Sequence, residues 1–209
     1  PLIDNAIDFA QEAGCDPIVA NLHYRADMLE AYLQPKGVLT INEQPKILET
    51  GGGFRNALPV LGNGPHFTLN SDAVWTGPNP LRLLRAAWDP DRMDALLVCI
   101  PQSHAVGHRG AGDFDLQPNG QLTRGSESVY GGIQIMKPDA LHHIPDDAFS
   151  VNLAWDIYGR AGRLFGLSYP GQWCDVGHPG GIAEAEKMLK DSHVCPIGKT
   201  PTVWNRSWH

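Results

Sequence analysis

Long hydrophobic runs and an excess of positive charge are both missing from this sequence. No apolar stretch approaches the ~18 residues that a membrane-spanning helix needs. Lysine and arginine total 16 against 23 acidic residues, and the resulting net charge of -7 argues against a basic face for nucleic acid. A nucleotide substrate remains compatible, because a few N–H groups and one metal ion can hold phosphates on an acidic protein. We therefore expect neither a membrane nor a nucleic acid as partner.

Cysteines are few, and the motifs of several enzyme classes are absent. The four cysteines include no C-x-x-C pair, and three of them lie in apolar stretches. This pattern predicts buried, reduced thiols in a cytoplasmic protein rather than a disulfide framework. Neither G-x-S-x-G nor H-E-x-x-H occurs, which argues against a serine hydrolase and against a zinc site of that type.

The 209 residues are predicted to form one domain over 1–190, followed by a tail at 191–209. A domain of this size can bury enough surface to fold without a disulfide or a metal. The end of the tail contains proline and tryptophan without a clear period, so no secondary structure is predicted there.

Helical and strand patterns alternate along the first hundred residues. Apolar residues at helical spacing predict helices at 2–13, 25–33, 54–62 and 79–88. Asn79 and Pro80 are typical of a helix cap and a first helical position. Apolar or alternating runs predict strands at 17–22, 37–44, 66–72 and 94–100. This alternation favours a mainly parallel sheet with helices on both faces.

The second half is predicted to hold a hairpin and shorter strands. Residues 113–117 and 121–125 flank Pro118, Asn119 and Gly120, a hairpin pattern. A strand at 129–136, a helix at 150–162, short strands at 163–169 and 172–177, and a helix at 180–189 complete the chain. The predicted fold class is therefore α/β, a Rossmann-like three-layer αβα sandwich with a mainly parallel mixed sheet. One sheet would be shared by a nucleotide-binding first half and a substrate-binding second half.

Two aspartates lie at the ends of predicted strands. Asp72 follows FTLNS, and open α/β sheets bind ligands beyond the carboxyl ends of their strands. Asp175 interrupts an apolar strand near its end, where an acid needs a partner or a metal. Mg²⁺ favours one or two such carboxylates together with phosphate oxygens. Taken singly, each aspartate is more simply explained by turn formation, helix capping or a salt bridge.

Two glycine-rich runs are candidates for close approach to a ligand. The run LETGGG at 48–53 precedes a predicted helix, and its glycines can take positive φ and turn N–H groups toward an anion or a base edge. The alternative is a flexible turn, and no G-K-[ST] follows to make a P-loop. The glycines of VYGGI at 129–133 mark either close approach of a ligand or a bulge.

These motifs occur together, in this order, in one known family. LETGGGFRNALPVLG at 48–62, LNSD at 69–72, YGGI at 130–133 and WCDVG at 173–177 resemble segments of sugar-1-phosphate nucleotidyltransferases. The resemblance runs over about residues 1–190 and implies the nucleotide-diphospho-sugar transferase fold. LETGGG, in place of the more widespread L-G-T-A, is most similar to N-acetylmuramate 1-phosphate uridylyltransferases. Mannose-1-phosphate guanylyltransferases are the second likeness.

The resemblance implies roles for individual residues. Asp72 and Asp175 match the two aspartates that hold the catalytic Mg²⁺. The segment that lines the nucleoside pocket corresponds to Glu49, Thr50, Gly51 and Gly52. The other expected substrate-binding residues are Asn70, Gly112, Asp113, Tyr130, Gly132 and Asn152. Tyr130 stands where many relatives have asparagine.

One segment of the family has no counterpart in this sequence. The family begins with a strand and a glycine-rich loop that carries an arginine and, further on, a lysine, and this loop cradles the triphosphate. Here the first residues, PLIDNAIDFA, resemble the helix that follows the loop. We expect the loop to precede Pro1 in the complete protein. A sheet without its central first strand would leave strand edges and apolar helix faces uncovered.

The implied activity joins a nucleoside triphosphate to a sugar 1-phosphate and releases pyrophosphate. The sugar phosphate would attack the α-phosphorus in line, and catalysis would consist of positioning and charge neutralisation. UTP with N-acetylmuramate 1-phosphate, in cell-wall sugar recycling, is the first expectation, and GTP with mannose 1-phosphate is the second. The missing loop also leaves open a non-catalytic regulatory protein that binds a nucleotide sugar. The sequence indicates no oligomeric state.

Overall fold

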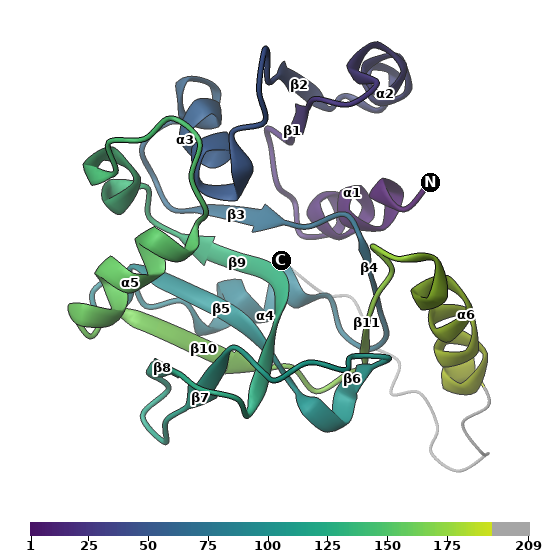
Figure 1. The fold of residues 1–209 in the computed structure, drawn as a ribbon, viewed down its shortest axis with the longest axis vertical. Helices are drawn as coiled ribbons and strands as arrows, with labels where there is room; N and C mark the ends of the chain where they lie inside the picture. The colour runs from purple at the N-terminus through teal and green to yellow at the C-terminus, as the bar shows by residue number, and fades with distance from the viewer. Residues whose placement is uncertain (194–209) are drawn as a thin grey trace, which may run out of the picture.

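A computed structural model describes residues 1–193, which are built around a mixed sheet of six strands (Figure 1). The strands are β3 (His66–Leu69), β5 (Ala95–Pro101), β7 (Phe114–Leu116), β8 (Leu122–Arg124), β9 (Ser128–Met136) and β10 (Leu164–Ser168). Their order is β10-β5-β9-β7-β8, and β3 also pairs with β9. β5 and β10 are parallel, whereas β9 is antiparallel to both β3 and β5. Strands β3, β5 and β10 therefore run in one direction, and the sheet is mixed as predicted.

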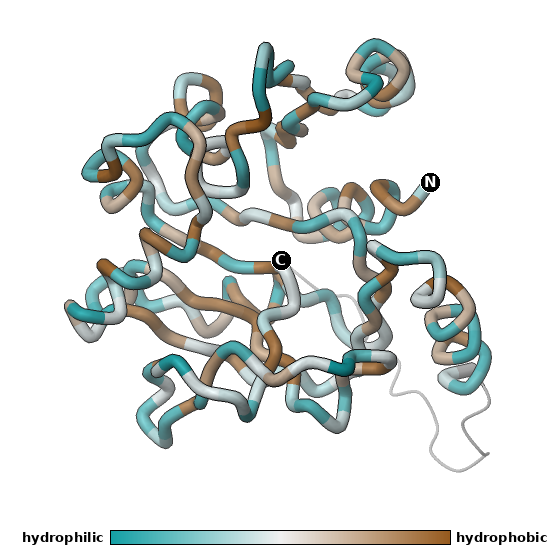
Figure 2. The backbone as a smooth tube through the Cα atoms, viewed as in Figure 1, coloured by the Kyte–Doolittle hydropathy of each residue, from teal (hydrophilic) through white to brown (hydrophobic). Residues whose placement is uncertain are grey.

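Helices cover both faces of this sheet. α1 (Ile3–Glu12) and α4 (Pro80–Ala87) contribute Ala10 and Leu84 to a core against one face. α3 (Glu49–Leu61) and α5 (Asn152–Arg160) contribute Phe54 and Trp155 to a core against the other. Hydrophobic segments concentrate along the central strands, and hydrophilic ones along the outer loops (Figure 2). The predicted three-layer αβα sandwich is confirmed.

Residues 1–193 form three sheets where the sequence predicts one. β1 (Val19–Leu22) and β2 (Leu39–Asn42) pair only with each other among residues 1–193, and α2 (Ala26–Leu33) connects them. β4 (Ala73–Trp75), β6 (Ala105–Val106) and β11 (Trp173–Asp175) form the third sheet, on which α6 (Pro179–His193) packs. Three 3₁₀ helices lie at Gln34–Lys36, Gln102–His104 and Asp139–His143. The predicted tail at 191–209 falls outside the described residues, except for its first three positions.

Local contacts explain where several elements begin and turn. Asn79 Oδ1 accepts from the N–H of Leu81 at 2.9 Å, and Pro80 opens the first turn, so α4 begins as predicted. The hairpin of β7 and β8 turns at Gly120, whose φ of +88° is unfavourable for residues with a Cβ. β4, directly after Asp72, is an element that the sequence does not predict.

Three of the four cysteines lie among residues 1–193. Cys15, Cys99 and Cys174 are free thiols, and the last two are buried. Cys195 lies outside the described residues. Within residues 1–193 no helix combines the length and the apolar character needed to cross a bilayer.

Candidate active site

Residues of α1, β1, α3 and β3 line a cleft of about 890 Å³, and Figure 1 labels these four elements. Among residues 1–193, β1 pairs only with β2 and β3 only with β9, so each strand has one unpaired edge. Ile3, Ala6, Ile7 and Ala10 of α1 line the same cleft. The cleft is therefore bounded by two strand edges and by an apolar helix face.

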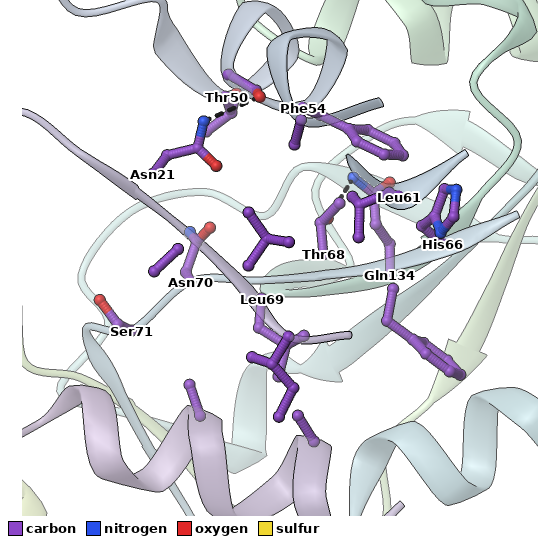
Figure 3. Close-up of a pocket in the computed structure, with 18 of the residues that line it drawn as sticks. Asn21, Thr50, Phe54, Leu61, His66, Thr68, Leu69, Asn70, Ser71 and Gln134 are labelled. Carbon is purple, nitrogen blue, oxygen red and sulfur yellow. Dashed lines mark hydrogen bonds between the residues drawn. The ribbon is translucent and has the colours of Figure 1, made fainter. Parts of the chain in front are cut away.

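Polar residues from several elements line this cleft, among them Asn21 of β1, Thr50 of α3 and Asn70 after β3 (Figure 3). The sequence predicts six of the residues that line it, namely Glu49, Thr50, Asn70, Asp113, Tyr130 and Asn152. The structure thus brings residues from distant parts of the chain, such as Glu49 and Asn152, to one cleft. Asp72, Asp175, Gly51, Gly52, Gly112 and Gly132 do not line the cleft.

Asp72 and Asp175 lie next to each other, just beyond Asn70 and Ser71 at the cleft wall. Asp175 ends β11 and pairs with Ala73, and the N–H of Val176 donates to the backbone oxygen of Asp72 at 2.8 Å. Both carboxylates face Gly177. A Cβ at that glycine would lie 3.1 Å from Asp175 Oδ1 and 3.3 Å from Asp72 Oδ2.

The donor chemistry of this pair fits a hard divalent cation. Neither carboxylate forms an ion pair within residues 1–193, and Asp175 Oδ1 accepts only the N–H of Gly177, at 2.8 Å. The same part of the chain contains no cluster of three or more metal-ligating side chains. Two carboxylates without further protein ligands suit Mg²⁺, which retains waters and takes phosphate oxygens.

The three glycines of LETGGG correct a prediction. They lie inside α3, which begins at Glu49 rather than at residue 54, and none of them takes positive φ. A Cβ on Gly51 would lie 2.5 Å from the ring of Phe149, and one on Gly52 would collide with the backbone oxygen of Asp147. Gly51 and Gly52 therefore admit close packing of the 147–149 segment, and none of the three glycines takes the left-handed backbone expected of them. The positive φ belongs to Glu49, at +59°.

The strand VYGGI carries a bulge, as one of its two interpretations predicts. The pairing register of β5 with β9 shifts between Leu97 and Cys99, opposite the two glycines. Gly132 has a φ of +84°, and a Cβ there would lie 2.9 Å from Asn70 Cβ. Its oxygen accepts from the N–H of Asn70 at 2.8 Å. Gly132 thus holds the Asn70 loop against β9 instead of facing the cleft.

Asp113 and Tyr130, two of the predicted substrate-binding residues, are linked by a hydrogen bond. Asp113 Oδ2 accepts from the N–H of Tyr130 at 2.8 Å, and the N–H of Asp113 donates to Ser128. Gly112 packs against the backbone of Ser126 and Ser128, where a Cβ would find no room. Burial raises the pKa of Tyr130 well above its ordinary range, so its phenol stays neutral.

A buried polar chain in the cleft wall is not predicted from the sequence. Trp155 Nε1 donates to Gln134 Oε1 at 2.7 Å. Gln134 Nε2 in turn donates to Thr68 Oγ1 at 3.0 Å (Figure 3). Gln134 is 2% exposed in the middle of an apolar strand. A buried amide in that position needs partners, and this requirement is the pattern in the sequence that could have pointed to the site. Glu43 and Asn21, which also line the cleft, are likewise absent from the predicted set.

Comparison with known proteins finds named relatives, although no family model matches the chain. The chain is 34% identical over 206 residues to the N-acetylmuramate alpha-1-phosphate uridylyltransferase of Caulobacter vibrioides, covering 91% of this chain and 85% of that protein. It is 26% identical over 195 residues to the mannose-1-phosphate guanyltransferase of Pichia angusta, covering 86% and 53% respectively.

A solved structure supports the fold. The crystal structure of HddC from Yersinia pseudotuberculosis complexed with GMP-PN superposes with a TM-score of 0.71 at 18% identity, covering 90% of this chain and 85% of that one. Identity at that level supports the fold alone, whereas the uridylyltransferase is similar over nearly the whole described chain. The chain therefore belongs to the sugar-1-phosphate nucleotidyltransferases, a family of enzymes.

Proposed function

We propose that this enzyme transfers the uridylyl group of UTP to N-acetylmuramate 1-phosphate, with Mg²⁺ held between Asp72 and Asp175. The observation that carries the proposal is the convergence of these two carboxylates on Gly177, with Asp72 directly following Asn70 and Ser71 of the cleft wall. The relative with 34% identity, a uridylyltransferase by name, supports the choice of substrates. Free thiols at Cys15, Cys99 and Cys174 are compatible with the cytoplasmic location predicted from the sequence.

The residues that line the cleft would have different roles in binding the two substrates. The turn at 48–50 supports the nucleoside, since Glu49 and Thr50 line the cleft and the turn is hydrogen-bonded to Phe149 and Val151. Asp113, Tyr130 and Asn152 also line the cleft, and their polar groups can serve as the donors and acceptors that hydroxyl groups of a sugar need. The neutral phenol of Tyr130 can donate a hydrogen bond but cannot act as a base at neutral pH.

Transfer requires no nucleophile from the protein. A sugar phosphate oxygen forms the new bond to the α-phosphorus of UTP, the bond to the bridging oxygen breaks, and pyrophosphate leaves with both electrons of that bond. Held by Asp72 and Asp175, Mg²⁺ would supply neutralisation of the charge on the phosphates. The contribution of the chain is to align the two substrates and to exclude other sugars.

The test is release of pyrophosphate measured over four nucleoside triphosphates and several sugar 1-phosphates. We expect kcat/KM to be highest for UTP with N-acetylmuramate 1-phosphate. A preference for GTP with mannose 1-phosphate would favour the second candidate, which the Pichia angusta relative supports. Tight binding of a nucleotide sugar without any turnover would contradict both candidates and favour a regulatory role.

A further inference from the structure

Glu43 is a buried acid without a cationic partner. It follows β2 directly and is 6% exposed, and no ion pair among residues 1–193 includes it. Burying a carboxylate costs free energy that only good hydrogen bonds can offset. Its oxygens accept two such bonds, from Asn21 Nδ2 at 2.8 Å and from the N–H of Leu48 at 2.9 Å.

The two donors around Glu43 can be satisfied only by a side chain with two acceptor oxygens. The second hydrogen of Asn21 Nδ2 goes to the backbone oxygen of Gly53, at 2.9 Å. The amide of Asn21 therefore cannot turn round, because its own oxygen would then face another oxygen. A glutamine in place of Glu43 would present its NH₂ group either to the N–H of Leu48 or to the NH₂ of Asn21. A Cβ on Gly53 would lie 2.7 Å from Glu43 Oε1, so the packing leaves no room for a shift.

The bond to Leu48 holds the first turn of α3, Leu48–Thr50, in which Glu49 and Thr50 line the cleft. Leu48 also accepts from the N–H of Phe149 at 3.1 Å, and Thr50 Oγ1 accepts from the N–H of Val151 at 3.1 Å. The turn is thus fixed to the segment that precedes α5 on one side, and to the β1–β2 unit through Glu43 on the other. Between these anchors Glu49 adopts its left-handed backbone, a conformation that costs about 1 kcal/mol or more and needs support from its surroundings.

We propose that Glu43 is a positioning residue that sets the Leu48–Thr50 turn for the nucleotide. It determines where the turn stands relative to β1 and hence the affinity for the nucleoside triphosphate, not the rate of transfer. This inference rests on the proposed function, in which the turn supports the nucleoside.

The test compares Glu43→Gln with wild type and with Glu30→Gln as matched control. Glu30 is exposed on α2 and accepts one hydrogen bond from Thr40 of β2, so the control makes the same chemical change on the same unit. UTP affinity is measured by calorimetry in magnesium buffer, and KM and kcat by pyrophosphate release. Hydrogen exchange reports on the amide of Leu48.

For Glu43→Gln we expect Kd and KM for UTP to rise about tenfold or more, equivalent to ~1.4 kcal/mol. We also expect faster exchange at Leu48, while kcat and the KM for the sugar phosphate stay near wild type and Glu30→Gln changes nothing. A merely structural role would instead lower the active fraction, and with it kcat, at constant KM. If Glu43→Gln does not fold, Glu43→Asp replaces it, because aspartate keeps the charge but is too short to reach both donors. A raised KM for UTP in Glu43→Asp would then support the positioning role, and an unchanged KM would contradict it.

Wild-type affinity and KM for UTP in Glu43→Gln would overturn the positioning role while leaving the proposed function intact. A wild-type protein that neither binds UTP nor releases pyrophosphate with any substrate pair would overturn the proposed function, and the positioning role with it.

Discussion

Asp72 and Asp175 can be tested as single residues because neither has a neighbour in the fold that depends on its charge. Changing either to asparagine keeps the size of the side chain, and at Asp175 it also keeps the acceptor for the N–H of Gly177, so we expect the melting temperature to change little. Loss of one cation ligand is expected to lower kcat/KM by about 100-fold or more, on the scale of removing one electrostatic group at a reacting centre. Pyrophosphate release and thermal denaturation measure the two effects.

The exposed Asp8 on α1 provides the control for this pair, since no hydrogen bond or ion pair of its side chain is present among residues 1–193. Asp8→Asn should match wild type in both measurements. Retention of most activity in Asp72→Asn or Asp175→Asn would show that the carboxylates do not share a catalytic cation.

Gly52 and Gly64 differ in what surrounds them. A Cβ at Gly52 would overlap the backbone oxygen of Asp147, whereas a Cβ at Gly64 would meet nothing within 4 Å. We expect Gly52→Ala to destabilise the fold by about 1–3 kcal/mol, because backbone must move to make room. Gly64→Ala is expected to stay within about 0.5 kcal/mol of wild type. Urea denaturation of the two variants measures the difference, and equal stabilities would mean that the 147–149 segment is not packed on α3.

At the scale of elements, periodic patterns in the sequence predict where helices and strands lie. They do not predict the contacts that determine the residue at which each element begins or ends. The helix at 54–62 is predicted from its apolar spacing, because glycine is a poor helix former. In the structure α3 starts five residues earlier, since Gly51 and Gly52 allow the backbone of Phe149 and Asp147 to pack closely. No local pattern contains this information, because the partner segment lies about a hundred residues away.

A cluster around Asp94 joins three elements at one end of the sheet. The carboxylate precedes β5 and accepts from Lys137 Nζ, just after β9, at 2.8 Å. It also accepts from Arg163 Nε, just before β10, at 2.6 Å. Burial by itself raises the pKa of Asp94, but the hydrogen bonds from Arg163 and Lys137 outweigh it and hold the pKa below the ordinary 3.8.

This lowered pKa predicts how stability depends on pH. The charged form of Asp94 stabilises the fold fully above the unfolded pKa of 3.8, and the contribution disappears as pH falls through the lower folded value. We therefore expect Asp94→Asn to lose about 2 kcal/mol at pH 7, on the scale of hydrogen bonds to charged groups. The deficit should shrink once the pH drops below about 4.

Denaturant unfolding at pH 7, 5, 4 and 3 measures this deficit, with Asp146→Asn at an exposed site as control. A deficit that stays constant down to pH 3 would contradict the role of the charge and point to packing alone.

At the scale of the whole molecule, the order of the motifs was sufficient to predict the family and the layered fold. The resemblance also predicts that Asp72 and Asp175 act together, although neither residue is distinctive alone. The structure adds what sequence could not, namely that β4 and β11 pair and so place both carboxylates beside Gly177. Division into three sheets was missed because strand patterns do not specify which strands pair.

Because of the cleft between β1 and β3, we expect some parts of the chain to unfold locally at lower free energy than others. β1 and β2 are mostly half-buried or exposed and share a sheet of two strands. By contrast, β5 and β9 are buried almost throughout, and each of them pairs with strands on both of its edges. Amides protected by few buried contacts open locally at low free energy, and those of central strands open only near global unfolding.

Hydrogen exchange followed by mass spectrometry tests this directly on the 209-residue chain. We expect peptides over 19–42 to exchange at least about tenfold faster than peptides over 95–101 and 128–136, in keeping with a free-energy difference above ~1.4 kcal/mol. The difference follows from the free edge of β1, since pairing on a second edge would protect its outward N–H groups. Equal protection of both regions would mean that the edge facing the cleft is covered in solution, and the cleft would then be a closed interior rather than an accessible site.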